Sequence, residues 1–460
     1  MYVTRLRLDG VRGFHGQRAC DLDFTRPDGR YAGWTVIAGR NGSGKTTLLR
    51  AIAVGLAGPK RASQLDSDLE GELSFGRAEG SLTVDIQASP EADIRTQPHG
   101  ESLTARVDWK PEREAYSSDD EPPTELQFSS IGDLKTRLWS SAPPPGWFHA
   151  GYGPFRRITG TGLYERTPPQ LDRTAALKTL FEEWSALTEP FDWLLSAHLR
   201  RLEDRNRPPE DRTGAQELVD SVLALLNDGL LRDGYRIVDV DSDGMWLHRQ
   251  SQVDIDDGQR IEVRRTSDGQ RTVIALVLDI VRQMDAAYEN LAISWRNHRP
   301  YLSYPGVVLI DEVDTHLHMT WQKEIGKWFK DHFPAVQFIV STHSPYICQA
   351  ADEGGLIRLP GPDEQEPPAA ISPALWKRIV YGTGDDAALS ELFGLDTPYS
   401  DEAQLLRREL TGLEARVVMG EATEEEEARH DELRQRLKSS PRTRVAEVQA
   451  RLRRLGVFDE

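Results

Sequence analysis

Eight consecutive residues near the start of the chain have the types and spacing needed to bind a triphosphate. The run GRNGSGKT, from Gly39 to Thr46, matches the phosphate-loop pattern G-x-x-x-x-G-K-[ST]. Its glycines let backbone N–H groups curl around a phosphate, and the N-terminus of the following helix adds positive potential. The pattern predicts that Lys45 reaches the β- and γ-phosphates and that the Thr46 hydroxyl is a ligand of Mg²⁺. The predicted nucleotide-binding residues are Arg40, Asn41, Gly42, Ser43, Gly44, Lys45, Thr46 and Thr47.

Acidic residues that could complete such a site follow an apolar run later in the chain. Residues 307–310 read as a buried strand that ends at Asp311 and Glu312. An Asp at this place can hold Mg²⁺ through water, and the adjacent Glu can polarise the water that attacks the γ-phosphate. A second apolar strand ends at His343, whose neutral imidazole could hydrogen-bond the γ-phosphate.

A polar turn at residues 266–270 precedes an apolar helix and allows two interpretations. The structural interpretation is ordinary helix capping. The functional one is an anion site built from the Ser267 hydroxyl, the Gly269 amide and the helix N-terminus. Asp268 is unfavourable near a phosphate unless its carboxylate points away. Gln270 completes the S-x-G-Q order.

A phosphate loop must connect a strand to a helix, and the sequence predicts both elements. A strand (34–39) precedes the phosphate loop, and a helix (46–57) follows it. Residues 72–110 alternate as in an antiparallel sheet, residues 110–125 read as a loop, and residues 171–232 have helical spacing. A hairpin with a turn at Asp243-Gly244 comes next. Further amphipathic helices are predicted beyond residue 400, the last at 443–455.

The layout resembles that of ATP-binding-cassette (ABC) ATPases, whose signature turn usually reads L-S-G-G-Q. The N-terminal LRLDGVRGF, the THSP after the last strand and the large insertion before the signature resemble the branch with SMC proteins, RecN and RecF. Several phrases are similar to the PtuA ATPases of Septu anti-phage systems and their retron-associated relatives. These are GYGPFRR (151–157), SDGQRTVIAL (267–276), DEVDTHLHMTWQ (311–322) and ELFGLDTP (391–398).

The resemblance implies an α/β P-loop fold of the ABC, SMC-like type with an antiparallel β subdomain, a helical insertion and a C-terminal helical extension. It divides the chain into a first ATPase half (1–170), an insertion with a hairpin (171–265), a second ATPase half (266–385) and a helical region (386–460).

It also implies that the chain binds and hydrolyses ATP with Mg²⁺, held by Thr46 and Asp311, and dimerises around the nucleotide. Glu312 and His343 would be catalytic. Ser267, Asp268, Gly269 and Gln270 would act on the nucleotide of a second copy, and Asp314 would lie in the dimer-contacting D-loop.

Three functions remain as alternatives on this basis. The first is the sensor subunit of a bacterial anti-phage complex, which controls an HNH-type nuclease supplied in trans and has no nuclease activity of its own. The second is a DNA repair or recombination ATPase of the RecF or RecN kind. The third is a self-contained nuclease of the overcoming-lysogenization-defect kind. That one needs a Toprim domain after His343, where the sequence instead has charged helices.

Two details depart from the family or suggest another ligand. Transporter-type ABC ATPases have a glutamine where this chain reads Ala150-Gly151-Tyr152-Gly153-Pro154. The alternatives are that Tyr152 replaces it, that a water replaces it, or that hydrolysis is slow. His316 and His318 invite a metal interpretation, but no cysteine or further histidine lies nearby in the sequence, which argues against one.

Composition limits the partners. The net charge is −18, so contact with DNA requires a local basic patch. Two candidates are Arg156 with Arg157, and the set Arg200, Arg201, Arg205, Arg207 and Arg212; a solvated helix face is the alternative for the second set. No apolar run is long enough to span a membrane. The two cysteines, Cys20 and Cys348, suit a cytoplasmic protein without disulfides.

Overall fold

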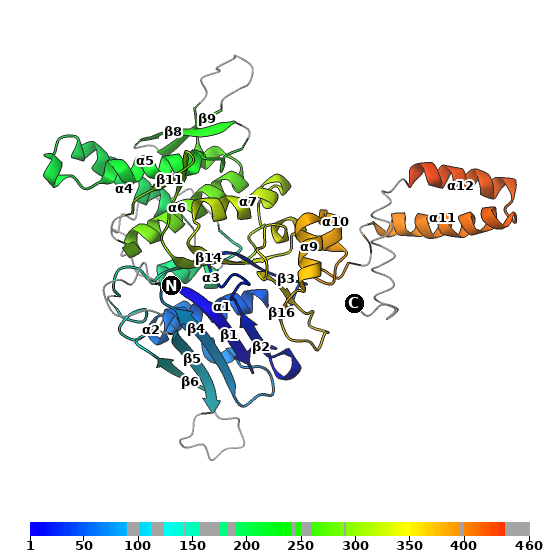
Figure 1. Cartoon of the computed structure of the whole chain (residues 1–460), viewed down its shortest axis with the longest axis horizontal. Helices are drawn as coiled ribbons and strands as arrows, with labels where there is room; N and C mark the ends of the chain where they lie inside the picture. Colours follow the sequence, from blue (N-terminus) through cyan, green and yellow to red (C-terminus); the bar gives the residue numbers. More distant parts are fainter. Residues whose placement is uncertain are drawn as a thin grey trace. The chain divides into compact units, whose positions relative to one another are not determined.

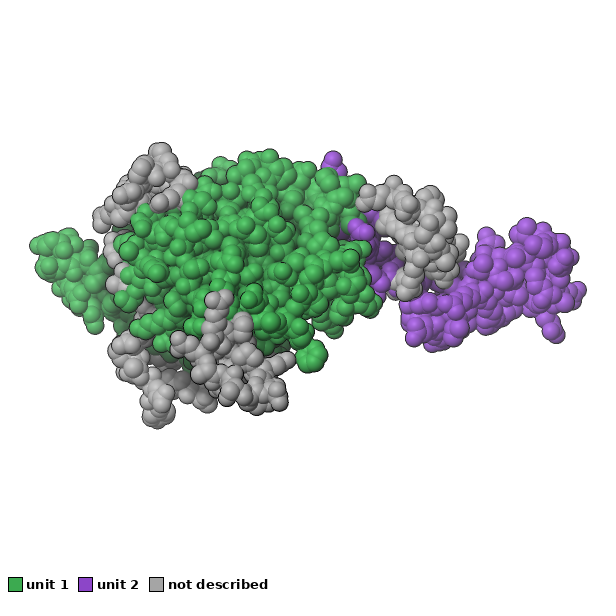
Figure 2. Space-filling model, turned by 90° about the horizontal axis from the view of Figure 1, so that it is seen from below, with its two compact units in different colours: residues 1–376 green, residues 377–460 purple. Residues whose placement is uncertain are grey.

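The chain divides into two units, Met1–Trp376 and Lys377–Glu460, which Figure 2 colours separately. The computed structural model describes residues 1–89, 102–111, 124–141, 143–156, 174–182, 187, 189–232, 234–241, 244–249, 260–288, 291–395, 397 and 399–437. Most of the predicted loop at 110–125, Asp243 of the predicted turn, and the helix predicted at 443–455 lie outside these ranges.

A six-stranded sheet carries the nucleotide motifs. Its order is β16 (Ala369–Ala370), β15 (Leu356–Leu359), β3 (Gly33–Gly39), β14 (Val336–Thr342), β13 (Gly306–Ile310) and β7 (Phe148–Tyr152). The strands from β15 to β7 are parallel, and only β16 is antiparallel. β13 and β14 are buried along their whole length, as expected for strands covered on both faces. Their carboxyl ends meet at one edge, which brings the loops that follow them together.

The predicted antiparallel subdomain is present and extends further than the sequence indicated. Its order is β2 (Cys20–Asp23), β1 (Tyr2–Asp9), β4 (Gly80–Gln87), β5 (Ser102–Pro111) and β6 (Thr124–Ile131). The alternating pattern predicted strands up to residue 110, and β6 was not anticipated. In Figure 1 this sheet forms the lower part of unit 1.

Helix α1 (Lys45–Ala57) lies between the two sheets and fills the core. Leu48 and Ile52 belong to the same buried cluster as Val84 of β4 and Leu309 of β13. At Gly55 a Cβ atom would lie 2.6 Å from Val84 Cγ2, so the absence of a side chain lets the helix approach the antiparallel sheet. Burial of the apolar face of α1 on both sides fixes the position of its N-terminus, where the phosphate loop ends.

The remaining elements of unit 1 are mainly helical. They comprise α2 (Pro59–Leu65), α3 (Ala175–Phe181), α4 (Glu189–Asp204), α5 (Ala215–Asn227), α6 (Asp268–Tyr288), α7 (Met319–His332) and α8 (Pro345–Cys348). A small sheet is formed by β8 (Tyr235–Asp241), β9 (Gly244–Arg249) and β10 (Arg260–Glu262), and a separate hairpin by β11 (Ser294–Arg296) and β12 (Arg299–Tyr301). The predicted α/β fold with an antiparallel subdomain and added helices is thus confirmed.

The second unit is a short helical region. Helix α9 (Pro373–Tyr381) spans the boundary, followed by α10 (Gly384–Ala388), α11 (Asp401–Met419) and α12 (Glu424–Arg436). Leu410 of α11 packs with Leu433 and Leu437 in a small core. Arg429 of α12 pairs with Glu409 of α11 at 2.8 Å. No helix in the described part of the chain combines the length and apolarity needed to cross a bilayer.

Candidate nucleotide site

The phosphate loop connects β3 to α1, and its lysine is held by the loop itself. Lys45 Nζ donates hydrogen bonds to the carbonyl oxygens of Gly39 (2.9 Å) and Arg40 (3.0 Å). Burial lowers the pKa of Lys45 to about 8, although the nearby acidic residues oppose the shift. The Ser43 hydroxyl is buried and has no hydrogen-bond partner among the described residues. A cradle with one confined cation and one unsatisfied hydroxyl fits a phosphate group.

Phe14 explains why the last loop position must be glycine. Gly44 adopts φ +99°, a conformation that side chains rarely take, and it forms the N-cap of α1. A Cβ atom there would lie 2.5 Å from Phe14 Cζ. Phe14 is itself almost fully buried, so the ring cannot move aside easily. Sequence reasoning missed this contact because Phe14 is 30 residues away from the loop.

The predicted magnesium ligands meet directly. Thr46 Oγ1 donates to Asp311 Oδ2 at 2.7 Å, although the two residues come from α1 and the end of β13. A hydroxyl and a carboxylate side by side are the oxygen donors that Mg²⁺ prefers. Asp311 is further fixed by Ser341 Oγ, which donates to its other oxygen, and by its own N–H, which donates to the Tyr152 carbonyl at 2.7 Å. The donor set therefore fits Mg²⁺.

Glu312 is held in an unusual backbone conformation. Its φ is +45°, which is costly for a residue with a Cβ atom and is typical of functional sites. Its N–H donates to Ser341 Oγ at 2.8 Å, and Arg156 Nη2 donates to its carbonyl at 3.0 Å. Ser341 thus holds Asp311 and Glu312 together, a role that the sequence did not reveal.

Arg156 corrects one sequence-based prediction. It was a candidate for contact with DNA, but its side chain is only 2% exposed, and its guanidinium also donates to the Asp311 carbonyl at 3.3 Å. Burial lowers the pKa of Arg156 to about 10, against the pull of the same acidic residues. Arg156 is therefore a support of the acidic pair rather than a surface cation. Arg157 lies outside the described residues.

His343 lies at the carboxyl end of β14, at the edge of the same site. Burial and the positive charge of Lys45 lower the pKa of His343, so the neutral ring predominates at pH 7. Its backbone N–H donates to Asp314 Oδ1 at 3.3 Å, and the Thr342 hydroxyl donates to the same oxygen. The predicted D-loop residue thus contacts the His343 segment within one chain.

The predicted signature turn lies against the loop that follows β13 and contains Asp314 and His316. At Gly269 a Cβ atom would lie 2.5 Å from the carbonyl oxygen of His316. Ser267 and Asp268 are exposed where α6 begins. Asp268 forms an ion pair with Arg271, which offsets the negative charge that made this position a departure from the family pattern. Among the described residues, the Ser267 hydroxyl makes only a long contact, accepting from the N–H of Gln270 at 3.5 Å.

Tyr152 does not point its hydroxyl at the acidic pair. The hydroxyl donates to Asp279 Oδ2 of α6 at 2.8 Å, and Arg282 Nη2 donates to Asp279 Oδ1 at 2.7 Å. All three side chains are almost completely buried. The suggestion that this hydroxyl replaces the missing glutamine is wrong in this structure. Tyr152 instead ties β7 to the helix that carries the signature turn.

The other tempting residues have local roles. His318 is the N-cap of α7 and accepts a hydrogen bond from the Thr320 N–H at 3.3 Å. Of the second arginine set, Arg201 pairs with Asp220 and Arg207 with Glu203, each at 3.2 Å. This interleaving favours the solvated helix face over a nucleic-acid surface.

Comparison with known proteins identifies relatives. Residues 34–349 match the family described as "AAA domain, putative AbiEii toxin, Type IV TA system" (AAA_21). The "Septu protein PtuA" of Bacillus mycoides (strain KBAB4) is 26% identical over 399 residues, covering 86% of this chain and 46% of that protein. The "Retron Vc95 probable ATPase" of Vibrio cholerae serotype O1 biovar El Tor is 23% identical over 386 residues, covering 75% of this chain and 71% of that protein. The chain thus spans less than half the length of that PtuA relative.

Comparison with solved structures finds an SMC head bound to the C-winged helix domain of ScpA. It is 15% identical, with a TM-score of 0.46, covering 81% of this chain and 98% of that one. The family match runs from β3 to the end of α8, so it takes in the phosphate loop, the acidic pair and His343. With these motifs in one match, the chain belongs to the AAA_21 family of P-loop ATPases and is related to the Septu PtuA and retron ATPases.

Proposed function

We propose that two copies of this chain close around two ATP molecules and thereby control a nuclease subunit of an anti-phage defence system. The defence role is supported by relatives named as Septu and retron proteins. The shared-nucleotide mechanism is supported by the resemblance of the 266–270 turn to the ABC signature and by the geometry around it.

One observation carries the mechanism. The 266–270 turn lies against the His316 carbonyl at Gly269, while Asp314, two residues earlier in the loop of His316, holds the His343 segment of the nucleotide site. A single loop therefore touches both half-sites of one chain. The exposed turn offers a hydroxyl, an amide and a helix N-terminus to an anion. The γ-phosphate held by the Lys45 loop of a second copy is the ligand that suits it.

The residues of the site divide the chemistry between them. Lys45 and the loop amides bind the phosphates, and Thr46 and Asp311 would hold Mg²⁺, which supplies charge neutralisation when bound. The Glu312 carboxylate orients the attacking water and accepts its proton. Neutral His343 donates a hydrogen bond to the γ-phosphate and loses that contact when the phosphate leaves. Because ATP bound by both copies stabilises only the closed form, its hydrolysis shifts the population toward the open form.

The partner would be an HNH-type nuclease supplied in trans. The helices of unit 2, with exposed charged faces on α11 and α12, dimerise the chain, hold this nuclease, or form a plain capping bundle. Deleting residues 401–460 and testing co-purification of the nuclease tests the docking role. Retained binding of the nuclease would exclude docking by the deleted helices.

Two experiments test the shared site. The Glu312→Gln chain should bind ATP without hydrolysing it and should shift to a dimer or higher oligomer in light scattering, whereas Glu312→Gln/Lys45→Ala should not shift. An unchanged mass with ATP would contradict the mechanism.

The second experiment mixes two inactive chains. Lys45→Ala has a damaged loop, and Ser267→Arg has a damaged signature turn. In a shared-site dimer the mixture contains one intact composite site, so ATPase activity should return when the two are combined. If the mixture stays inactive while each chain still dimerises with the wild type, the signature does not act in trans.

A further inference from the structure

The hairpin β11–β12 is a basic and aromatic projection in a strongly acidic chain. Residues 291–310 contain no Asp or Glu, although the whole chain has a net charge of −18. Within this stretch Trp295 is 60% exposed, and Arg296, His298 and Arg299 are exposed as well. None of these residues belongs to the nucleotide site.

The register of the hairpin places two like charges opposite each other. Arg296 pairs with Arg299 across the strands, and Trp295 pairs with Pro300 on the other face. Like charges in a cross-strand pair are destabilising. The guanidinium of Arg296 lies 5.0 Å from the Tyr301 ring centroid and has no carboxylate within ion-pair distance in the described part of the chain. A polyanion would relieve this repulsion.

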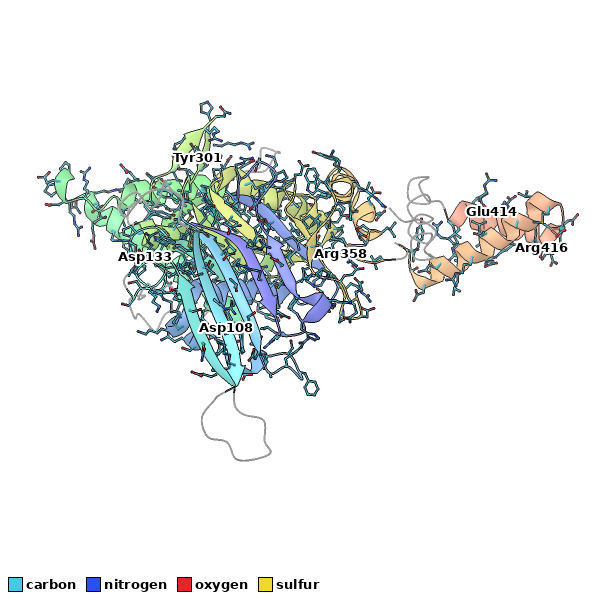
Figure 3. All side chains as sticks on the ribbon, turned by 60° about the horizontal axis from the view of Figure 1, so that its bottom comes forward. Asp108, Asp133, Tyr301, Arg358, Glu414 and Arg416 are labelled. Atoms are coloured by element: carbon cyan, nitrogen blue, oxygen red, sulfur yellow. The ribbon has the colours of Figure 1, made fainter. Side chains whose placement is uncertain are left out.

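The turn and base of the hairpin are rigid. Asn297 (φ 50°) and His298 (φ 63°) both adopt left-handed conformations, as in the tight turns that suit twisted hairpins. At the base, Leu302 is fully buried, and its N–H donates to the His332 carbonyl at 2.8 Å. The exposed side chains are therefore presented by a preorganised element, which reduces the entropy lost on binding. Tyr301 is labelled near the upper edge of unit 1 in Figure 3.

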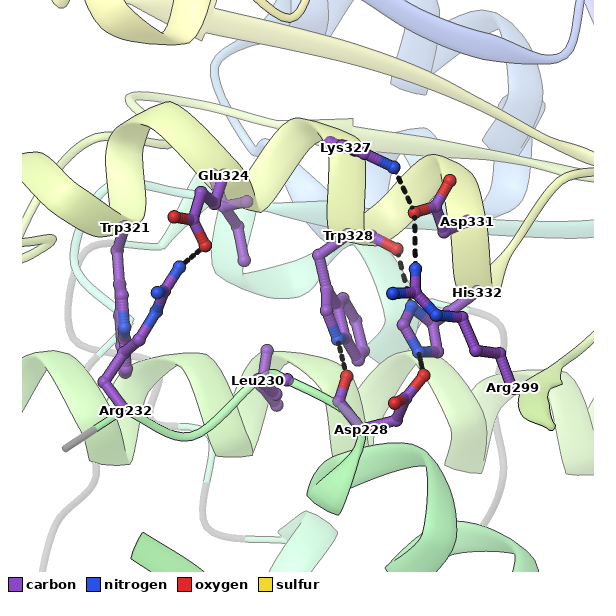
Figure 4. A pocket seen from close by; sticks show the side chains of 12 residues that line it. Asp228, Leu230, Arg232, Arg299, Trp321, Glu324, Lys327, Trp328, Asp331 and His332 are labelled. Atoms are coloured by element: carbon purple, nitrogen blue, oxygen red, sulfur yellow. Dashed lines mark hydrogen bonds and ion pairs between the residues drawn. The ribbon is translucent and has the colours of Figure 1, made fainter. Parts of the chain in front are cut away.

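The groove beside the hairpin is a different kind of surface. It has a volume of about 430 Å³ and is lined by Trp321, Trp328 and three carboxylates, those of Asp228, Glu324 and Asp331 (Figure 4). Glu324 is paired with Arg232, and Asp331 accepts from both Lys327 (2.6 Å) and Arg299 (3.4 Å). The acidic and basic side chains of the groove therefore balance, and its carboxylates would repel a phosphate backbone. Arg299 is part of this balance, so among the described residues the hairpin's unbalanced positive charge is that of Arg296.

We propose that the hairpin Ser294–Tyr301 binds an unpaired nucleic-acid strand. Trp295 stacks on a base, because an exposed indole can stack on any unpaired base. Arg296, on the opposite face, binds a flanking phosphate, and Arg299 binds a second one in exchange for its 3.4 Å contact with Asp331. A duplex hides its base faces and offers the indole no such contact. This surface is independent of the shared ATP site.

The experiment uses the full chain without nucleotide, so that its outcome does not depend on ATP-driven dimerisation. Binding of fluorescently labelled dT20, rU20 and a 20-base-pair duplex is followed by anisotropy over a series of salt concentrations. Trp295→Ala should weaken binding of a single strand by about 5- to 150-fold, the range for loss of one stacked base, while Trp295→Phe retains most of it. Arg296→Gln removes one phosphate contact, so the negative slope of log K against log salt should become shallower by about 0.7.

Matched controls are Phe75→Ala, a fully exposed aromatic residue elsewhere, and Arg408→Gln, an exposed cation of α11. Both should bind as the wild type does, and all variants should keep the wild-type thermal transition and ATPase rate. Whether dT20 or rU20 binds more tightly shows whether the hairpin prefers single-stranded DNA or single-stranded RNA. The proposal is overturned if Trp295→Ala binds both strands normally, if the duplex binds better than either strand, or if the hairpin variants lose only a protein partner.

Discussion

Removal of the Tyr152 hydroxyl tests how β7 is tied to the signature helix. In Tyr152→Phe, Asp279 Oδ2 loses its 2.8 Å hydrogen bond inside the core, while Oδ1 keeps Arg282. Leaving one buried acceptor without a donor costs about 1–3 kcal/mol. Burial and the adjacent Asp279 raise the pKa of Tyr152 well above its usual value, so the hydroxyl remains a donor throughout the pH range of the assay.

The same network makes a stronger prediction for its cation. Arg282→Met leaves the carboxylate buried with only Tyr152 as a donor, and removal of one partner of a buried ion pair costs about 3–5 kcal/mol. Replacing all three polar groups together (Tyr152→Phe, Asp279→Leu, Arg282→Met) should cost less than Arg282→Met alone, because no uncompensated charge is left.

Guanidinium unfolding followed by tryptophan fluorescence, without nucleotide, gives the order of the midpoints. The wild type should unfold last and Arg282→Met first, with Tyr152→Phe and the triple variant between them. Tyr31→Phe is the control, since the Tyr31 ring stacks on Tyr2 and no hydrogen bond of its hydroxyl is recorded within the described residues. A triple variant that unfolds before Arg282→Met would refute the reasoning, because the costs would then be additive losses of contact rather than the penalty of a buried charge.

Three further predictions concern the nucleotide site. ATP binding should weaken roughly tenfold from pH 7 to 9, because the pKa of Lys45 is about 8 and its positive charge is lost as the pH rises; flat affinity in isothermal titration would contradict this. His343→Ala should lower the hydrolysis rate by at least about 10²-fold but leave ATP affinity near normal, and equal loss of both would point to a structural role. Gly44→Ala should abolish binding of a fluorescent ATP analogue, and Phe14→Ala should restore only part of it in the double variant, because the steric clash is removed but the strained φ remains.

Much of the site could be predicted from the sequence because its motifs are local. The glycine spacing from Gly39 to Lys45 specifies a backbone cradle at a helix start, and the apolar run before Asp311 specifies a buried strand with acids at its end. Thr46 and Asp311 were both predicted to hold Mg²⁺ and were therefore expected together, and Thr46 Oγ1 lies 2.7 Å from Asp311 Oδ2. The fold class followed from the resemblance that these motifs carry to ABC ATPases.

Contacts between distant segments could not be predicted in this way. Local patterns do not specify which surfaces pack on each other, so neither the Phe14 ring against Gly44 nor the Ser341 hydroxyl shared by Asp311 and Glu312 was anticipated. The sequence offered Arg156 as a surface cation and Tyr152 as a substitute for a glutamine, and both are buried in support roles.

The sequence alone therefore determined that the chain binds ATP through a phosphate loop on an α/β sheet, because backbone conformation and strand periodicity are encoded within a few residues. Only the tertiary structure decided which polar side chains lie in the candidate nucleotide site and which support it from the core. That choice depends on burial and on partners far away in the sequence, 265 residues for Asp311 with Thr46 and 127 residues for Asp279 with Tyr152.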